Sequence, residues 1–455
     1  MNKKNISRIS KSLIKAGQQL PSDKKFKFSF DSQHLHYQSY LQSFSSDHYL
    51  LLDELYEELA VDKSIDRLFS GDFVNASEER PALHHKYRSS SSEFEFNFKK
   101  ITQKLSTKIN NGKYDNIITF GIGGSYEGPK LLQELCFTPS STYKYFFVSG
   151  PDKDEFNAVV KPLLGQKNFY IFASKSLATD ETLSCLHWLG SNRNAQNSLA
   201  ITSNLNAALK LGFPNSSIAL FPESVGGRYS IWSPISLSAS LENNFSSFLK
   251  GGSQADSLLF SKSTEAKKYK KLLKTLAFSD LWFSNYRKKC NRVVLSYNWR
   301  LRSFANYIQQ LEMESLGKPM TPSSIFTETG QTIFGGFGST AQHSYFQLLH
   351  QGTSNFSADI LYSPRAQSPL SAAQAKGQAS LLSSKKQYSK NILEITNSNT
   401  PVNLFALKSI SLPALGFLLA TWEHRVFVNA CMLEINPFDQ FGVAAGKAAA
   451  RKFLA

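Results

Sequence analysis

Short apolar runs without polar alternation mark the middle of this chain. They lie at residues 117–120, 145–148, 169–172, 199–201 and 218–221. Helix-length segments, such as 129–136 and 180–189, separate most of them. Runs of this kind are typical of parallel strands that are buried on both faces of a sheet. The pattern therefore predicts a doubly wound α/β domain over residues 96–245.

A second set of apolar runs follows the stretch Lys250-Gly-Gly-Ser-Gln254, which we interpret as a seam between domains. These runs lie at residues 293–295, 360–362 and 402–405, and residues 299–315 between them have apolar side chains at helical spacing. We expect a second α/β domain over residues 246–455, closed by a helix over 444–453. Residues 1–95 are predicted to be a helical N-terminal region. The predicted fold class is thus α/β, with two doubly wound domains built on parallel sheets.

Composition adds a constraint on partners. Hydrophobic residues make up 41% of the 455 residues, enough to build buried cores and to exclude a disordered chain. The net charge of +16 is compatible with nucleic acid, an anionic membrane or phosphorylated small molecules as partners. The basic residues are scattered and form no long run, which favours a solvated basic surface. We therefore expect neither nucleic acid nor a membrane as partner.

The cysteines and the N-terminus indicate a compartment. Four cysteines lie far apart at positions 136, 185, 290 and 431, and no CxxC pair occurs, so we expect free thiols in a reducing environment. No apolar core follows the positive charges at the N-terminus, so a signal peptide is not expected. The longest apolar stretch, 412–422, is about half as long as a membrane span requires. The sequence predicts a soluble cytoplasmic protein.

Two polar turns follow predicted strands and precede predicted helices. They are Gly121-Ile-Gly-Gly-Ser125 and Ser174-Lys-Ser-Leu-Ala-Thr179. Backbone N–H groups at a helix N-terminus, with hydroxyl groups beside them, can bind a phosphate. Each turn alone is equally compatible with a structural role, the first in packing and the second in helix capping. Two of them at one sheet edge favour a bound anion.

Charged residues elsewhere are candidates for chemistry. Arg228 follows Val225-Gly-Gly, and its permanent charge suits a developing oxyanion, although a surface arginine after a turn is the alternative. Glu314 and Glu312 end a predicted helix, and helical geometry does not choose between them as a base. His343 and His350 could be proton shuttles or hydrogen-bonded core groups. No His/Asp/Glu spacing suggests a metal site, and we expect no metal or other cofactor.

Taken in order, the segments resemble the glucose-6-phosphate isomerase family. Besides Val225-Gly-Gly-Arg228 and the two polar turns, the resemblance rests on Met313-Glu-Ser-Leu-Gly-Lys318, Gln342-His343 and Phe438-Asp-Gln-Phe-Gly-Val443. It extends from about Asn75 to Lys447. It implies domains of the SIS type and the reversible isomerisation of glucose 6-phosphate and fructose 6-phosphate, in glycolysis and gluconeogenesis. The reaction would pass through an enediol.

The resemblance also implies roles for individual residues. Glu314 would be the base, Arg228 would stabilise the intermediate, and His343 and Lys447 would assist ring opening. The substrate and phosphate contacts would be Gly124, Ser125, Ser174, the backbone of Lys175, Ser176, Thr179 and Gln440. Members of the family are homodimers in which the active-site histidine comes from the neighbouring subunit, so His343 is expected to be shared in this way.

Some positions depart from the family pattern. Ala178 lies where the family usually has a hydroxyl, and Leu316 replaces the usual asparagine after Met-Glu-Ser. These changes concern phosphate affinity and loop detail and not the reaction. Two alternatives remain open from the sequence: a non-catalytic regulator that binds sugar phosphates, and an isomerase that also acts on mannose 6-phosphate.

Overall fold

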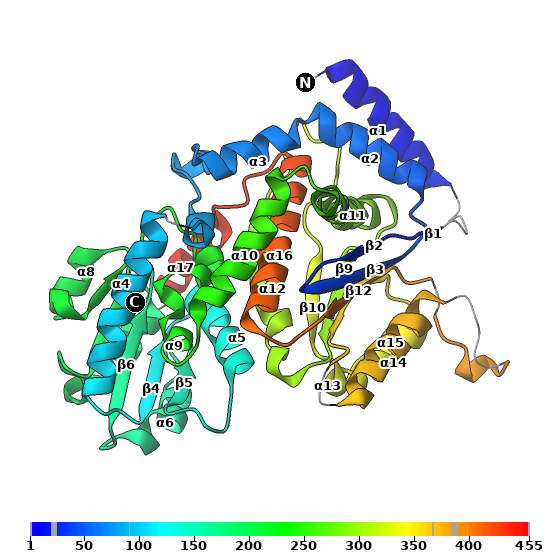
Figure 1. Ribbon diagram of the computed structural model, residues 1–455. Helices are drawn as coiled ribbons and strands as arrows, with labels where there is room; N and C mark the ends of the chain where they lie inside the picture. Colours follow the sequence, from blue (N-terminus) through cyan, green and yellow to red (C-terminus); the bar gives the residue numbers. More distant parts are fainter. Residues whose placement is uncertain are drawn as a thin grey trace.

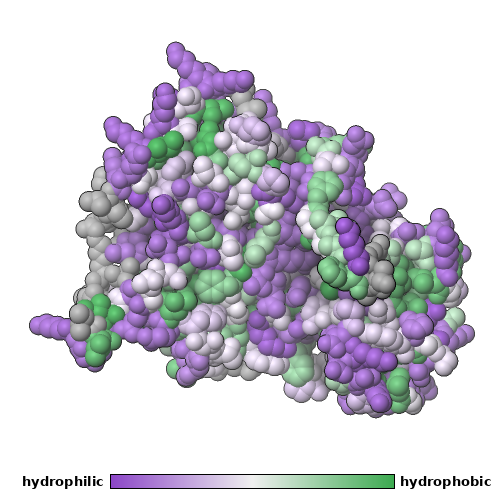
Figure 2. Space-filling model, turned by 180° about the vertical axis from the view of Figure 1, so that it is seen from behind, coloured by the Kyte–Doolittle hydropathy of each residue, from purple (hydrophilic) through white to green (hydrophobic). Residues whose placement is uncertain are grey.

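Two β-sheets flanked by helices lie side by side in the computed structural model of the chain (Figure 1). The structure describes residues 2–19, 25–90, 92–365, 368–384, 390–397 and 399–453. Hydrophilic side chains are spread over the face shown in Figure 2, with hydrophobic ones in small separate groups. Among the described residues, no helix is long and apolar enough to cross a membrane.

The first sheet has five parallel strands in the order β5-β4-β6-β7-β8. Their bounds are Asn116–Phe120 (β4), Lys144–Val148 (β5), Asn168–Ala173 (β6), Ser198–Thr202 (β7) and Ile218–Leu220 (β8). Every residue of β4, β6 and β7 is buried, which explains why the apolar runs do not alternate. The accompanying helices are Glu93–Asn111 (α4), Glu127–Cys136 (α5), Lys153–Val159 (α6), Asp180–Leu189 (α7) and Leu205–Lys210 (α8). The strands expected over residues 96–245 are confirmed.

The strand order of this sheet selects one place for a ligand. The chain runs from β4 outward to β5 and then returns across β4 to β6 on its other side. Neighbouring strands whose connections leave in opposite directions create a crevice at their carboxyl ends. The turns that follow β4 and β6 are the two polar turns singled out from the sequence. Both therefore border this crevice.

The second sheet is mixed. Its parallel part contains Asn291–Ser296 (β9), Thr332–Phe337 (β10), Phe356–Tyr362 (β11) and Val402–Leu407 (β12), in the order β10-β9-β11-β12. Leu35–Gln42 (β3) pairs antiparallel with β12, while Ser29–Asp31 (β2) and Lys25–Phe26 (β1) pair with β3. The last three strands come from the N-terminal region that we expected to be helical.

That expectation is correct only for part of the N-terminal region. Its helices are Lys3–Gln18 (α1), Ser46–Glu58 (α2) and Val61–Ser70 (α3). In β3, Leu35, Tyr37, Ser39 and Leu41 are buried and alternate with half-buried residues. This two-residue period is the pattern of a strand with one covered face. The pairing with β12 makes this segment part of the second sheet.

Strand β10 was also missed from the sequence, because two glycines interrupt its apolar pattern. Gly335 and Gly336 have φ angles of +152° and +150°. A Cβ at Gly335 would lie 1.9 Å from the carbonyl oxygen of Val294 on β9. Only glycine fits a backbone conformation and a close approach of this kind.

The remaining helices pack between and around the sheets (Figure 1). They are Leu237–Ser240 (α9), Phe245–Phe260 (α10), Thr264–Tyr286 (α11), Phe304–Leu316 (α12), Gly338–Gln342 (α13), Phe346–Gln351 (α14), Pro369–Ser383 (α15), Leu412–Leu433 (α16) and Phe441–Arg451 (α17). The predicted seam at 250–254 lies inside α10, so it is not a linker. The glycines there serve packing, since a Cβ at Gly251 would lie 2.0 Å from the carbonyl oxygen of Pro413, on α16.

Replacing Gly416 with alanine should force α10 and α16 apart. A Cβ at this position would lie 2.1 Å from the carbonyl oxygen of Phe248, which is fixed in the α10 backbone. We expect Gly416→Ala to lower the free energy of unfolding by about 1–3 kcal/mol, as overpacking does. The control is Gly377→Ala in α15, where a Cβ would meet nothing within 4 Å. The control should gain up to about 1 kcal/mol from helix propensity. Urea unfolding of both variants measures the difference, and equal midpoints would refute the packing argument.

Candidate active site

A cavity of about 620 Å³ opens at the carboxyl edge of the first sheet. Its walls come from both halves of the chain. The first half contributes the two polar turns and the segment around Arg228, and the second contributes Glu314 on α12 with Gln440 and Lys447 near the C-terminus. Nearly all the site residues predicted from the sequence therefore lie around one space.

The glycine turn after β4 touches the segment that carries Arg228. Gly123, in a 3₁₀ turn over Gly123–Ser125, has a φ angle of +57°. A Cβ on the buried Gly124 would lie 1.9 Å from the carbonyl oxygen of Gly227. Glycine is therefore required at this point, because any side chain would separate the two segments. Ser125 is half-buried and lines the cavity.

The hydroxyl-rich turn after β6 is shaped by its own side chains. The Ser174 and Thr179 hydroxyl oxygens lie 3.0 Å apart, and the backbone N–H of Leu177 donates to Ser174 Oγ at 3.2 Å. The Ala178 N–H donates to Ser176 Oγ at the same distance. Thr179 is the N-cap residue of α7, yet its side chain makes no capping hydrogen bond. The simple capping role considered for this turn therefore does not hold for Thr179, and its hydroxyl lines the cavity.

Lys175 is half-buried at the edge of this turn. Its ammonium donates to the carbonyl oxygen of Glu223 at 2.6 Å. Burial, together with the nearby Arg80 guanidinium, lowers the pKa of Lys175 to about 8. Arg80 pairs with Glu78 at 2.5 Å and lies 3.6 Å from the Glu223 carboxylate. These residues line the cavity, whose wall therefore carries a set of paired charges.

Arg228 is almost fully buried, and its guanidinium is held by fixed acceptors. Its Nε donates to Ser315 Oγ at 2.8 Å, and its Nη2 donates to the carbonyl oxygens of Pro437 and Asp439 at 2.6 and 2.8 Å. Its Nη1 donates to Gln440 Oε1 at 3.1 Å. The same Nη1 lies 3.3 Å from Glu314 Oε2 at the cavity wall. Arg228 is therefore a buried residue of the cavity wall, so the surface-turn alternative is wrong.

Tertiary packing separates Glu314 from Glu312. Glu314 is half-buried, lines the cavity and accepts a hydrogen bond from Gln310 Nε2 at 3.2 Å. Glu312 lies on another face of α12 and is buried. It forms an ion pair with Arg292 and accepts a hydrogen bond from Trp422 Nε1 at 2.5 Å. Burial raises the pKa of Glu312, although Arg292 opposes that effect. Of the two carboxylates, only Glu314 faces the cavity.

The remaining candidates divide between the cavity and the surface. Lys447 lies on the exposed helix α17 and lines the cavity. His343 is exposed at the end of α13, beyond the edge strand β10, and is not among the residues that line the cavity in the single chain. His350 Nε2 donates a hydrogen bond to Gln378 Oε1 at 2.8 Å, and burial lowers the pKa of His350. The structure thus places His350 outside the candidate site.

Comparison with known proteins decides the family. The profile of the family described as Phosphoglucose isomerase matches residues 41–455. This chain belongs to the phosphoglucose isomerase family. A glucose-6-phosphate isomerase of Shewanella sp. (strain MR-4) is 31% identical over 464 aligned residues, which cover 89% of this chain and 84% of that protein. One from Shewanella sediminis is 30% identical, with 87% and 83% covered.

Solved structures support the fold of this phosphoglucose isomerase family member. A glucose-6-phosphate isomerase from Chlamydia trachomatis has a TM-score of 0.85 at 22% identity, and the match covers 100% of this chain and 95% of that one. A hypothetical protein from Thermus thermophilus has a TM-score of 0.69, also at 22% identity, over 90% and 96% of the two chains. The predicted α/β fold class, of the SIS type with parallel strands, is confirmed. The second sheet differs from the prediction, because it is mixed and not purely parallel.

Sequence reasoning missed several residues that shape the site of this family member. Gln310 lies one helical turn before Glu314, and the four-residue spacing on a predicted helix was the available signal. The Lys318 ammonium donates to both the backbone carbonyl and the carboxylate of Asp439. The same carbonyl oxygen accepts a hydrogen bond from Arg228, so Lys318 helps to hold this acceptor in place. No sequence pattern indicated this pairing, since the two residues are 121 positions apart. Within the described ranges, no group of three His, Cys, Asp or Glu could hold a metal ion.

Proposed function

We propose that this chain catalyses the reversible isomerisation of glucose 6-phosphate and fructose 6-phosphate in the 620 Å³ cavity. The observation that carries the proposal is the Glu314 carboxylate, which lies 3.3 Å from the buried Arg228 guanidinium. A base beside a fixed cation is what proton transfer through a negatively charged intermediate requires. Family membership and the names of the Shewanella relatives support the same reaction.

The phosphate would be bound by the polar turns. The Ser174, Ser176 and Thr179 hydroxyls lie at the N-terminus of α7, where backbone N–H groups and the helix dipole favour an anion. The Lys175 backbone and Ser125 would add to this contact. Binding energy from the phosphate would position the sugar carbons against the base. Gly124 and Gln440 would approach the sugar itself.

Glu314 would transfer the proton between adjacent carbons. It would remove the proton from C2 of the open-chain aldose and return it to C1 through an enediol. Arg228 would stabilise the negative charge on that intermediate, and four hydrogen bonds and the ion pair with Glu314 keep it in place. His343 and Lys447 would transfer protons to open the ring. Since the reaction involves no net redox change, it needs no redox cofactor, and in this proposal the Arg228 guanidinium takes the charge-stabilising role that a metal ion could fill.

The assembly and setting belong to the same proposal. In this proposal the chain works as a cytoplasmic homodimer in glycolysis and gluconeogenesis, with His343 completing the site of the neighbouring subunit. The position of His343 supports this, because it is exposed and lies outside the cavity of its own chain. A regulator that only binds sugar phosphates would have no use for Glu314 beside Arg228. Activity on mannose 6-phosphate would require different contacts at C2 of the sugar. A direct assay with that substrate tests this alternative.

The direct test is conversion of fructose 6-phosphate to glucose 6-phosphate by the purified chain. We expect full activity in excess chelator, because the sequence offers no metal-ligand spacing. The same assay with mannose 6-phosphate as substrate measures any side activity of the chain on that sugar. Loss of activity in chelator, restored by zinc or manganese, would contradict the cofactor-free mechanism. Binding of the sugar phosphate without turnover would support the regulator instead.

Changes in the hydroxyl-rich turn should weaken phosphate binding more than loss of the neighbouring ammonium. Ser174→Ala with Thr179→Val removes two hydroxyls from the cavity wall, whereas Lys175→Ala removes a group already bonded to Glu223. We expect the inhibition constant of 6-phosphogluconate to rise about tenfold or more for the double variant, at about 1.5–3 kcal/mol per charge-assisted hydrogen bond. The rise for Lys175→Ala should be smaller. The reverse order would identify the Lys175 ammonium as the anchor.

A further inference from the structure

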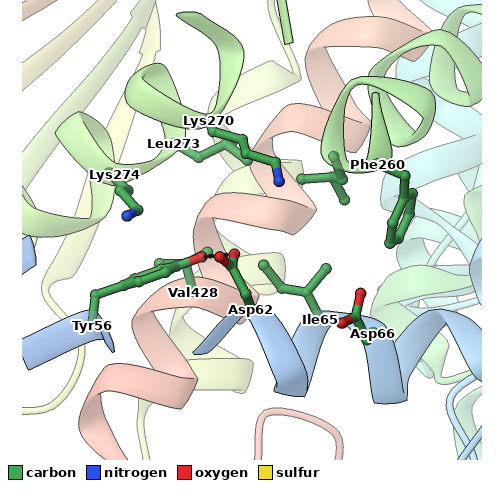
Figure 3. Close-up of a pocket in the computed structure, with 10 residues that line it drawn as sticks. Tyr56, Asp62, Ile65, Asp66, Phe260, Lys270, Leu273, Lys274 and Val428 are labelled. Carbon is green, nitrogen blue, oxygen red and sulfur yellow. Dashed lines mark hydrogen bonds between the residues drawn. The ribbon is translucent and has the colours of Figure 1, made fainter. Parts of the chain in front are cut away.

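A second cavity lies among α2, α3, α10, α11 and α16 (Figure 3). Its volume is about 290 Å³, and it shares no lining residue with the proposed active site. Its apolar wall comprises Ile65, Leu259, Phe260, Leu273 and Val428. Cavities near 300 Å³ with an apolar lining and a few polar groups are of the size that binds small organic molecules. Nothing in the proposed isomerase reaction uses this space.

Charges of opposite sign face each other across this cavity. Asp62 and Asp66 lie on α3, and Lys270 lies on α11. Figure 3 shows the Lys270 ammonium above the open space and the two carboxylates below it. Lys270 and Asp66 have no hydrogen-bond or ion-pair partner within the part of the chain that the structure describes. One oxygen of Asp62 accepts the Tyr56 hydroxyl at 2.6 Å, which orients that carboxylate.

The other lysine of this cavity is already used by the fold. Lys274 donates to Asp53 at 2.6 Å and to Glu57 at 3.2 Å, and its ammonium lies 4.0 Å from the centre of the Tyr56 ring. These contacts connect α11 to α2. Lys274 is therefore a structural residue, and Lys270 is the lysine that remains for a ligand.

We propose that this cavity binds a small zwitterion, an α-amino acid with an apolar side chain. The ligand ammonium would pair with Asp62 and Asp66, and its carboxylate would pair with Lys270. The side chain would cover the apolar wall formed by α3, α10, α11 and α16. The arrangement discriminates by charge: a sugar phosphate meets two carboxylates, and a purely apolar molecule leaves Lys270 and Asp66 without a partner.

The proposal is tested by titration calorimetry on the full chain with leucine and its two analogues. 3-Methylbutylamine lacks the carboxylate, and 4-methylpentanoate lacks the ammonium, but both keep the apolar part. We expect leucine to bind at least tenfold more tightly than either analogue, and equally well when 6-phosphogluconate saturates the other cavity. Failure of leucine to bind at tens of millimolar, equal binding of an analogue, or displacement by 6-phosphogluconate would each overturn the proposal.

Substitutions then identify the groups. Lys270→Met should weaken leucine at least fivefold and abolish its advantage over 3-methylbutylamine, and Asp66→Asn should also weaken it at least fivefold. The matched controls are Lys268→Met and Glu265→Gln, which remove exposed charges from α11 outside the cavity. These controls should bind leucine as the unmodified chain does. Unchanged leucine binding in Lys270→Met would show that the ligand binds elsewhere and would overturn the proposal. The analogue series uses the unmodified chain, so that part of the test does not depend on the folding of any variant.

Discussion

Glu314→Gln should yield a folded protein whose kcat is lower by about 10²–10⁴ or more, the contribution typical of a general base. Glutamine preserves the shape of the side chain, and its carbonyl can still accept from Gln310 and Arg228, which lie 3.2 and 3.3 Å from the present carboxylate. The fold should therefore survive while the base is lost. Turnover of fructose 6-phosphate and exchange of the C2 hydrogen with deuterated solvent measure the effect.

The control for this variant must be chosen from the structure. Glu312→Gln is unsuitable, because it removes a buried charge that pairs with Arg292 and should destabilise the protein. Glu328→Gln is better matched: its side chain is exposed in the loop between α12 and β10, and its hydrogen bonds to Asn285 come from the backbone. It should retain full activity. Solvent exchange at the wild-type rate in Glu314→Gln would show that another group is the base.

The second large effect is recovery of activity from two inactive variants. If each active site combines Glu314 of one chain with His343 of the other, a heterodimer of Glu314→Gln and His343→Ala places both defects in one site. The other site is then intact, because two-fold symmetry creates two identical shared sites. With random pairing, about half of the dimers are mixed and each has one good site. Unfolding and refolding the two variants together should therefore restore roughly a quarter of wild-type activity.

Each variant refolded alone is the control and should remain inactive. The mixture must also be shown to contain heterodimers, for example by separating chains that carry tags of different charge. A mixture with heterodimers that is as inactive as the separate variants would place His343 within its own chain's site. Such a result would leave the assignment of Glu314 untouched, because solvent exchange tests that residue independently.

The first sheet shows how much local pattern can predict. Its three central strands are buried on both faces, and uninterrupted apolar runs marked all five strands within a residue or two. The helices between them followed. The second sheet was harder. Strand β10 was not predicted, because Gly335 and Gly336 interrupt its apolar pattern. At Gly335 the backbone of the neighbouring strand is so close that no side chain fits. The alternation in β3 was visible, but its pairing with β12 connects residues more than 360 positions apart.

The sequence by itself determined the family, the two polar turns, and the residue types that proton transfer and phosphate binding need. These features are short motifs and the order in which they follow one another, and both can be read from the sequence of a single chain. The resemblance favoured Glu314 over Glu312, but only the tertiary structure showed the physical difference between them. Helical spacing places both near one end of α12, and packing buries Glu312 against Arg292 while Glu314 lines the cavity. It also fixed Arg228 through acceptors about 210 residues away, and placed His343 outside the cavity of its own chain. Such outcomes depend on which distant segments meet, and that is set by the packing of the whole chain.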